Sequence, residues 1–347
     1  MTSVWDDVVG QPTAVAALRA AVTAPVHAYL FTGPSGSTKH EAARAFAALL
    51  LTGVDDPTPR DARLALRGEH PDVHEVERVG PAISAEQARD IIHVTSLAPV
   101  EGARKIVVLH DFHLLTADAA ARLLKPIEEP PPSTTFVVLA DFVPPELITI
   151  ASRCVRIEFR SIPPAVMAER LRAEGVPADA VDETVAAAGG DIARARILAT
   201  DPDLVERRRA FATVPSRLDG TGATVVATVD DLLARIEAAA APLAARQAAE
   251  VAELEARIER FGERGSGRKA LEDRHRRELR RHRTDELRSG LGILAGAYRD
   301  VLVAGTALHP QAVVDAVTRI HGAVESMEHN PNETLLLQSL LWSLPVT

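Results

Sequence analysis

The stretch from Gly33 to His40 (GPSGSTKH) has most of what a loop needs to hold a phosphate group. The pattern G-x-x-x-x-G-K-[ST], set between a strand and a helix, binds phosphates through backbone N–H groups and the lysine. Gly33 and Lys39 fit this pattern, and Gly36 is a further glycine inside the turn. Thr38 stands where the second glycine belongs, and His40 replaces the hydroxyl residue that binds Mg²⁺. Since glycine permits a positive φ and imidazole is a poor Mg²⁺ ligand, we expect a loop that keeps its outline without its metal contact.

A second group of polar residues follows the apolar stretch 105–109 (KIVVL). Sites that hydrolyse nucleotides carry an acidic pair at the end of such a strand, and one of the acids binds Mg²⁺. Here His110 takes the place of that acid, while Asp111 keeps the next one. Because two metal contacts are missing together, we expect no hydrolysis. Turnover of nucleotide, and weak binding of nucleotide by the loop and Asp111, are less favoured than an empty structural loop.

These residues need a parallel sheet to bring them to one edge. Near-continuous apolar strands separated by helical patterns are typical of a parallel sheet covered on both faces. The strands are expected at 26–31, 72–79, 105–109, 135–139 and 155–159. The helices between them are expected at 41–51, at 84–97 behind a capping box (Ser84 and Gln87), and at 117–129 before three prolines.

The strand patterns end near residue 162, and the rest of the chain reads as helical. Residues 163–200 predict two or three short helices, and residues 201–347 predict helices throughout. A basic, charge-rich run at 264–288 stands out in an otherwise acidic protein. We favour a solvated helix or an insertion for this run. The alternative is an arm that contacts phosphates, which would make the chain a nucleic-acid-binding protein.

Composition excludes several classes of protein. The chain has 347 residues, 46% of them hydrophobic and 25% charged, which is typical of a folded soluble protein. Its net charge of −9 disfavours adhesion of the whole chain to nucleic acid. The single cysteine, Cys154, excludes an intramolecular disulfide and a multi-cysteine zinc site. Without a signal-peptide pattern or a long apolar run, we expect a cytoplasmic protein that does not enter a membrane.

Two groups of histidines could in principle bind a metal ion. His70, Asp72 and His74 alternate, so they would share one face of a strand. His110 and His113 lie close together in the sequence. Such histidines are more often hydrogen-bonded parts of the structure than ligands, so we expect no metal site.

Several segments carry a resemblance to a known family. They are WDDVVGQ (5–11), HAYLFTG (27–33), HPDV (70–73), LLKPIEEPP (123–131) and SRC (152–154). Together they resemble the AAA+ clamp-loader family of bacterial DNA polymerase III over roughly residues 5–160. NETLLLQSLL (332–341) looks like the closing helix of that family's collar domain. The resemblance implies a RecA-like α/β core at 1–162, a small helical lid at 163–200 and an all-helical collar, used for oligomerisation, at 201–347.

The chain also departs from this family at two places. Many relatives carry a four-cysteine zinc module after the loop helix, but residues 52–70 contain no cysteine. Pro126 lies within the LLK helix, where the family usually has a helix-forming residue. No zinc is therefore expected, and a kink near Pro126 is possible.

In this family the arginine of SRC reaches ATP held by a neighbouring subunit. The resemblance therefore assigns Arg153 as an arginine finger acting in trans, with Ser152 and Cys154 as positional neighbours. A guanidinium is planar and permanently charged, so it can pair with the charge on a transferring phosphoryl group. On the residues alone, Arg153 would be a surface arginine that caps a helix or pairs with an acid. Where the family's ATPases carry a sensing arginine, this chain has Ala193, and Arg194 is one residue away.

The resemblance implies a clamp-loader subunit that is not an enzyme by itself. Its expected partners are the gamma/tau and delta subunits and, through the complex, the sliding clamp and primer–template DNA. No cofactor of its own is required, since ATP and Mg²⁺ would be bound by neighbouring subunits, and DNA polymerase activity would belong to the complete holoenzyme. The alternative is an AAA+ ATPase subunit of the gamma/tau type. The retained Lys39 and Asp111 favour that alternative, and the four substitutions at Thr38, His40, His110 and Ala193 disfavour it.

Overall fold

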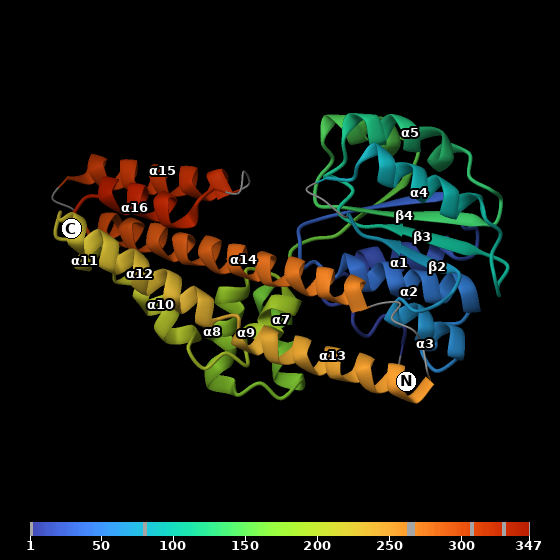
Figure 1. The fold of residues 1–347 in the computed structure, drawn as a ribbon, viewed down its shortest axis with the longest axis horizontal. Helices are drawn as coiled ribbons and strands as arrows, with labels where there is room; N and C mark the ends of the chain where they lie inside the picture. The colour runs from blue at the N-terminus through green and yellow to red at the C-terminus, as the bar shows by residue number, and fades with distance from the viewer. Residues whose placement is uncertain (1–2, 79–81, 262–267, 306–308, 328–330, 347) are drawn as a thin grey trace. The chain divides into compact units, whose positions relative to one another are not determined.

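The chain folds into two compact units, each with its own hydrophobic core. The computed structural model describes residues 3–78, 82–261, 268–305, 309–327 and 331–346. Unit 1 covers Met1–Arg196 and unit 2 covers Ile197–Thr347 (Figure 1). Within the described residues, unit 1 contains a sheet and helices, whereas unit 2 consists of helices and their connections.

A parallel sheet forms the centre of unit 1. Its strands are β1 (Ala28–Thr32), β2 (Val73–Val76), β3 (Lys105–Leu109), β4 (Thr134–Ala140) and β5 (Val155–Glu158). Their order across the sheet is β2-β3-β4-β1-β5, and all neighbouring pairs are parallel. Every residue of β1, β3 and β4 is buried, which explains why these strands are mostly apolar in the sequence. The loops that follow these strands meet at the carboxyl edge of the sheet.

Helices cover both faces of the sheet (Figure 1). They are α1 (Pro12–Ala21), α2 (Lys39–Thr52), α3 (Arg60–Arg67), α4 (Ala85–Ser96), α5 (Ala117–Glu128), a 3-10 turn η1 (Pro145–Leu147) and α6 (Ile148–Ala151). Phe31 packs with α1, α2 and α3, whereas Leu30 packs with α4 and α5. Neighbouring residues of one strand point to opposite faces, so each face has its own core. After the sheet follow α7 (Pro164–Ala173), α8 (Ala178–Ala188) and α9 (Ile192–Leu198).

The predicted fold class is confirmed, and most elements begin and end within a few residues of the prediction. α4 follows Ser84, whose side chain accepts a hydrogen bond from the backbone N–H of Gln87 at 3.2 Å. The side-chain amide of Gln87 donates to the carbonyl of Glu77. α5 continues through Pro126 and ends at Glu128, before the three prolines. Of the strand expected at 72–79, the last residue lies outside the described residues.

Unit 2 is built from helices, as the sequence predicts. They are α10 (Leu204–Ala212), α11 (Val214–Arg217), α12 (Gly222–Ala238), α13 (Ala241–Phe261), α14 (Arg268–Val303), α15 (Pro310–Ser326) and α16 (Glu333–Ser343). Side chains of α10, α12, α14, α15 and α16 share one core, which includes Phe211, Leu232 and Leu291. Among the described residues, no helix combines the length and the apolar character that crossing a bilayer requires.

A buried group of charges joins α10 to α14. Arg207 donates from Nε to Oε2 of Glu286 at 2.7 Å and from Nη2 to Oδ2 of Asp201 at 2.5 Å. The three side chains are between 3% and 4% exposed. Burial would lower the pKa of the Arg207 guanidinium, but the two carboxylates outweigh it and raise the pKa. The three side chains therefore form a buried ion-paired link within unit 2.

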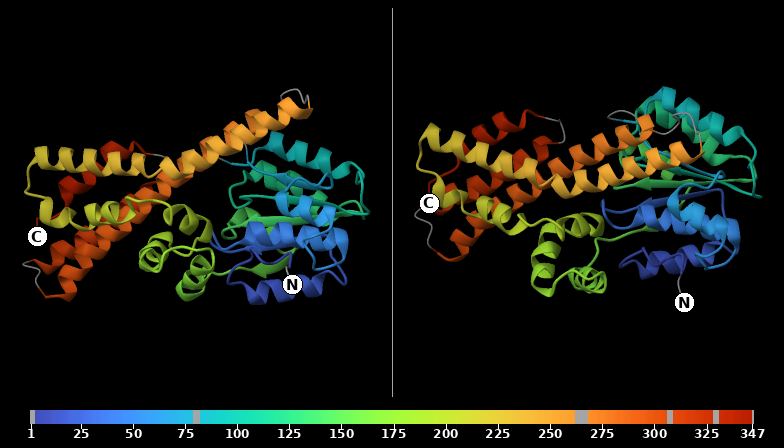
Figure 2. Two further views of the ribbon diagram at one scale, coloured as in Figure 1. Left: turned by 90° about the horizontal axis from the view of Figure 1, so that it is seen from below. Right: turned by 60° about the horizontal axis from the view of Figure 1, so that its bottom comes forward.

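The basic run lies mainly in α14, with residues 264–267 outside the described residues. α13 and α14 lie side by side in opposite directions (Figure 2). Acidic residues of α13 meet basic residues of α14, and acidic residues of α14 meet Arg246 of α13. These pairs are Arg268–Glu255, Arg274–Glu250 and Arg246–Glu278. The described part of the run is a helix with internal ion pairs, in agreement with the favoured interpretation, and contact with phosphates remains a prediction.

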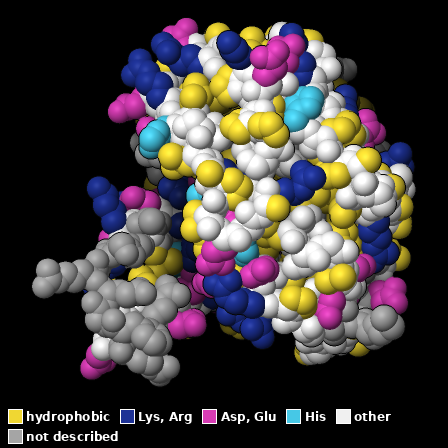
Figure 3. All heavy atoms as spheres, turned by 90° about the vertical axis from the view of Figure 1, so that its right-hand side faces the viewer, with side chains coloured by type: hydrophobic (Ala, Val, Ile, Leu, Met, Phe, Trp, Pro, Cys, Tyr) yellow, Lys and Arg dark blue, Asp and Glu magenta, His cyan; other side chains and the backbone are white. Residues whose placement is uncertain are grey.

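The charges of the protein are distributed rather than segregated on the face shown in Figure 3. Basic and acidic side chains are interspersed there, with hydrophobic side chains between them. The net charge of −9 is therefore not concentrated into one continuous field on that face.

Candidate functional site

The loop that joins β1 to α2 is a tight turn whose backbone favours glycine at two positions. A Cβ atom on Gly33 would lie 2.3 Å from the carbonyl oxygen of Phe159, so only glycine fits there. Thr38 has a φ of 60°, the left-handed conformation that glycine adopts readily. For a residue with a side chain this conformation costs about 1–2 kcal/mol. The backbone at this position therefore has a conformation that favours glycine, although a threonine stands there.

The start of α9 packs directly on this loop. Gly36 has a φ of 76°, and a Cβ atom on it would lie 2.2 Å from Cγ of Asp191. Oδ1 of Asp191 accepts a hydrogen bond from the backbone N–H of Arg194 at 2.9 Å, which holds the carboxylate at the N-terminus of the helix. A negative charge therefore lies against the loop that would have to hold a phosphate.

Lys39, the residue expected to contact phosphate, is only 2% exposed and already has three acceptors. Its Nζ donates to the carbonyls of Gly33 at 3.0 Å and Pro34 at 3.1 Å, and to Oδ1 of Asp141 at 2.6 Å. Asp141 directly follows β4, the neighbour of β1 in the sheet. Because an ammonium group has three N–H donors, these acceptors use all of them.

The two histidines at the expected metal-binding positions contact each other. Nδ1 of His40 and Nδ1 of His110 lie 2.9 Å apart. The rings are 20° from parallel with their centroids 5.0 Å apart, which suits an N–H···N bond close to a common plane. Nε2 of His110 lies 3.3 Å from Oε2 of Glu75. Which of the two Nδ1 atoms donates depends on the tautomers of the rings, and either arrangement joins His40 to His110.

Glu75 of β2 anchors the histidine pair. Arg44 of α2 donates to both of its oxygens, from Nε at 2.6 Å and from Nη2 at 2.8 Å. Burial would raise the pKa of Glu75, but His110 and Arg44 outweigh it and hold the pKa at about 2. Mg²⁺ prefers an octahedral set of oxygen ligands, and this imidazole pair does not fit it. The residues present are therefore unsuited to a magnesium–nucleotide complex.

Asp111, the retained member of the acidic pair, is engaged away from the loop. It has a φ of 49°, and its Oδ2 accepts from Nε of Arg78 at 3.3 Å. Two residues later, Nδ1 of His113 accepts from the backbone N–H of Asp141 at 3.2 Å. The expectation that His110 and His113 are hydrogen-bonded residues is confirmed. The sheet brings the end of β3 next to the loop, as predicted, through the contact of His110 with His40.

Arg153 lies just after α6 and is 34% exposed. Its Nη1 donates to the carbonyl of Thr149 at 2.8 Å, and its Nε lies 2.8 Å from Oε2 of Glu128. The hydroxyl of Ser152 donates to the same carbonyl at 2.9 Å. Burial raises the pKa of the Cys154 thiol to about 12, so this thiol is not a nucleophile near neutral pH. In the single chain Arg153 caps a helix and pairs with an acid, and its role in trans stays a prediction.

The position expected for a sensing arginine is an exposed alanine. Ala193 faces solvent on α9. Arg194, the next residue, donates from Nε to the carbonyl of Ala187 at the end of α8, at 3.2 Å. This guanidinium therefore contacts the C-terminus of a neighbouring helix.

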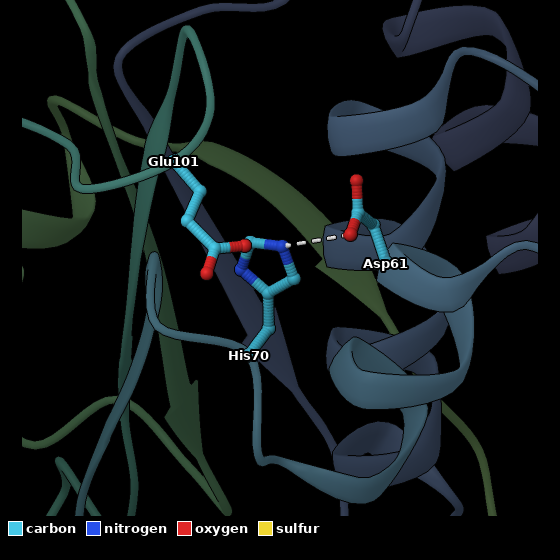
Figure 4. A group of neighbouring side chains, drawn as sticks. All are labelled: Asp61, His70 and Glu101. Atoms are coloured by element: carbon cyan, nitrogen blue, oxygen red, sulfur yellow. Dashed lines mark ion pairs between the residues drawn. The ribbon is translucent and has the colours of Figure 1, made fainter.

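Among the described residues, one group of side chains has ligand atoms close enough for a metal ion. Asp61, His70 and Glu101 bring theirs within 4.8 Å of one another (Figure 4). Nδ1 of His70 accepts from the backbone N–H of Asp72 at 3.0 Å, so the proton of the neutral ring is on Nε2. Nε2 lies 3.7 Å from Oδ1 of Asp61. The ring therefore presents a donor to the carboxylates, whereas a metal would need a lone pair there.

The prediction that His70, Asp72 and His74 share one strand face is wrong. β2 begins only at Val73, because Pro71 and Asp72 form a turn before it. Burial would raise the pKa of Asp72, but its carboxylate accepts from the backbone N–H groups of residues 100–102, which lowers the pKa. Asp72 thus fixes the loop that leads into β3.

Sequence reasoning missed Asp141 and Glu75. Asp141 is the first residue after the buried strand β4. Once β4 is placed beside β1, an acid at that point predicts a contact with the loop that follows β1. Glu75 lies in a stretch rich in polar residues (VHEVER, 73–78), as a solvent-facing residue would, so the sequence held no signal for it.

Comparisons with known proteins cover mainly this region. Residues 10–163 match a family model described as DNA polymerase III, delta subunit. The chain is 33% identical to DNA polymerase III subunit delta' of Bacillus subtilis, over 42% of this chain and 45% of the relative. It is 33% identical to subunit delta' of Pseudomonas aeruginosa, over 47% and 53%, and 31% identical to subunit gamma/tau of Mycobacterium tuberculosis, over 67% and 43%. The matches span about half the length of these relatives.

A solved structure has the same fold. The gamma subunit-related protein of DNA polymerase III from Thermotoga maritima superposes with a TM-score of 0.50, over 94% of this chain and 97% of that chain. Only 16% of the residues are identical, so the likeness concerns the fold alone.

Proposed function

We propose that this chain, a homologue of the clamp-loader subunits delta' and gamma/tau of DNA polymerase III over its N-terminal half, is a delta'-type subunit without ATP turnover of its own. The homology itself is what the sequence motifs predicted. The observation that carries the finer proposal is the state of the degenerate loop. Lys39 is bound to Asp141, and His40 is bound to His110. The groups that would hold ATP and Mg²⁺ are therefore engaged with other side chains of the same chain.

A subunit of this kind would be a fixed, non-hydrolysing part of the clamp-loader complex. It would bind gamma/tau and delta subunits and help to load the sliding clamp onto primer–template DNA in the cytoplasm. We also propose the division into a core at 1–162, a lid at 163–200 and a collar at 201–347. The three short helices α7, α8 and α9 support the lid, and the helical unit 2 supports the collar.

The chemical contribution of the chain would be Arg153. A guanidinium keeps its charge at any physiological pH and can stabilise the charge on a phosphoryl group held by a neighbouring subunit. Arg153 is partly exposed, and its contacts with Glu128 and Thr149 are those of a surface residue. Exposed ion pairs contribute only about 0–1 kcal/mol, so a phosphate can compete for this side chain.

A gamma/tau-type ATPase is the second candidate. The likeness to the gamma/tau subunit of M. tuberculosis extends over 67% of the chain, which favours it. Turnover would require Lys39 to exchange Asp141 for a phosphate, and Mg²⁺ to find ligands other than His40 and His110. These two requirements make it the weaker candidate.

The experiment is ATP hydrolysis by a complex reconstituted from this chain and the gamma/tau and delta subunits of the same organism. Arg153→Ala should lower hydrolysis at the neighbouring site by about tenfold or more, because arginine fingers contribute at least that much. Arg156→Ala is the matched control, since Arg156 is also exposed (54%) and lies three positions further along the chain. Normal assembly with unchanged hydrolysis in Arg153→Ala would contradict the assignment.

A further inference from the structure

Asp141 is held where it meets Lys39. The backbone N–H of Gly33 donates to the carbonyl of Ala140 at 3.2 Å, which joins the start of the loop to the end of β4. The next residue, Asp141, is fixed through its own N–H to Nδ1 of His113. Nε2 of the same ring lies 3.9 Å from Oδ2 of Asp141, so the imidazole contacts both the backbone and the side chain of this residue. These contacts fix the position of the Asp141 carboxylate at the end of β4.

The rest of the loop still has features that suit an anion. The side chain of Ser37 is buried, and its hydroxyl has no hydrogen-bond partner among the residues that the structure describes. α2 begins at Lys39 without a side-chain hydrogen bond at its N-cap, so donors at its first turn are not used by Thr38. Helix N-termini of this kind attract phosphate groups. The loop therefore keeps donors for an anion, while its lysine is committed to a carboxylate.

We infer that Asp141 is the residue that excludes polyphosphates from this loop, by taking the place of the anion on Lys39. A phosphate oxygen could reach Nζ only by displacing Oδ1 of Asp141, because the other two N–H groups are bound to the carbonyls of Gly33 and Pro34. A displaced Asp141 would remain beside the phosphate as a like charge. The ligand class that Asp141 excludes is that of inorganic polyphosphates and nucleoside polyphosphates.

Other charges near the loop act in the same direction. Asp191 lies against Gly36, and Glu41 stands in the first turn of α2. Arg44 and Arg196 also act on Glu41, but Arg44 is bound to Glu75 and Arg196 to Glu174. Lys39 is therefore the cation best placed to bind a phosphate, and its pairing with Asp141 decides whether an anion enters.

This inference deepens the part of the proposed function that concerns the chain's own loop, and its test uses the chain alone. The probe is inorganic pyrophosphate without Mg²⁺, titrated by calorimetry into the full-length protein at low salt. The unaltered chain should show weak binding or none. Asp141→Ala should bind at least about tenfold more tightly, since removal of one charge at contact distance is worth more than the 1.4 kcal/mol that a tenfold change requires. Asp141→Asn should fall between the two.

Two further variants make the result specific. Adding Lys39→Met to Asp141→Ala should abolish the gained binding, because the lysine is then gone. Asp90→Asn, the same loss of charge at an exposed position of α4, should leave binding unchanged.

Equal affinities in the unaltered chain and in both Asp141 variants would overturn the inference. Should Asp141→Ala not fold, Asp141→Asn carries the same comparison. Should neither variant fold even in millimolar pyrophosphate, an external anion cannot replace the carboxylate, and the inference is wrong. None of these outcomes depends on Arg153, so they are separate from the test of its role in trans.

Discussion

The left-handed conformation of Thr38 leads to an unusual stability prediction. At this position glycine should be better than alanine, whereas within helices the opposite holds. Both Thr38→Gly and Thr38→Ala lose the hydrogen bond from Oγ1 to the carbonyl of Ser37, which is 2.7 Å long in the native chain. Both also lose a buried methyl group, so these losses of about 1 kcal/mol each cancel in a comparison of the two variants.

What remains is the backbone term. Alanine keeps the cost of a φ of 60°, about 1–2 kcal/mol, whereas glycine avoids it. Glycine in turn loses about 0.4–1 kcal/mol relative to alanine, chiefly through the greater freedom of its unfolded chain and in part through the missing Cβ atom. The free energy of unfolding of Thr38→Gly should therefore exceed that of Thr38→Ala by about 1 kcal/mol.

Urea unfolding followed by tryptophan fluorescence can measure this difference within unit 1. The chain has two tryptophans, Trp5 and Trp342. In a Trp342→Phe background, the signal comes from Trp5, which is buried in unit 1. The control is Ala17→Gly on the exposed face of α1, which should lower the free energy of unfolding by about 1 kcal/mol. If Thr38→Ala proves as stable as Thr38→Gly, the backbone at this position does not favour glycine and the reasoning fails.

Three more predictions follow from ion pairs. In the folded chain the pKa of Glu75 is about 2, against an ordinary value of 4.5. This difference stabilises the fold by about 3 kcal/mol above pH ~4.5, and the contribution is lost as the pH falls toward ~2. Urea unfolding between those pH values should therefore be less pH-dependent in Glu75→Gln. Arg207→Ala leaves the buried carboxylates of Asp201 and Glu286 without their cation, so it should lower the free energy of unfolding of unit 2 by about 3–5 kcal/mol. Arg207→Met should have the same effect, and urea unfolding followed by circular dichroism can measure both variants. Glu128→Gln should change the free energy of unfolding by no more than about 1 kcal/mol. It should also raise ATP hydrolysis by the complex, up to about fivefold, because Arg153 loses its partner. A loss of hydrolysis as large as that of Arg153→Ala would mean that Glu128 positions the arginine.

The sheet could be predicted from the sequence because buried parallel strands are mostly apolar. Lys105–Leu109 was predicted to the residue, since both of its faces are covered. β2 was predicted too long, because the alternation in HPDVHEV begins in a turn that holds Asp72 against the next loop. Alternation of polar and apolar residues alone does not distinguish a strand residue from a turn residue, such as Asp72, whose side chain accepts hydrogen bonds from the backbone.

The site could be predicted only one position at a time. His40 and His110 are 70 residues apart, so the sequence showed two separate losses and not one hydrogen-bonded pair. The pairing of Lys39 with Asp141 spans 102 residues and depends on the strand order. Arg153 and Glu128 were both in segments that carry the family resemblance, but their contact depends on how α5 and α6 pack. Contacts across the sheet edge are set by topology, which residue types do not encode locally.

We propose that the chain does not hydrolyse ATP itself and acts within a complex. The direct measurement is steady-state ATP hydrolysis by the purified chain, and then by its mixture with gamma/tau and delta subunits, the sliding clamp and primed DNA. We predict no hydrolysis by the chain alone and strong hydrolysis in the mixture. Hydrolysis by the chain alone that Lys39→Met abolishes would contradict the claim and make the gamma/tau-type ATPase the correct assignment.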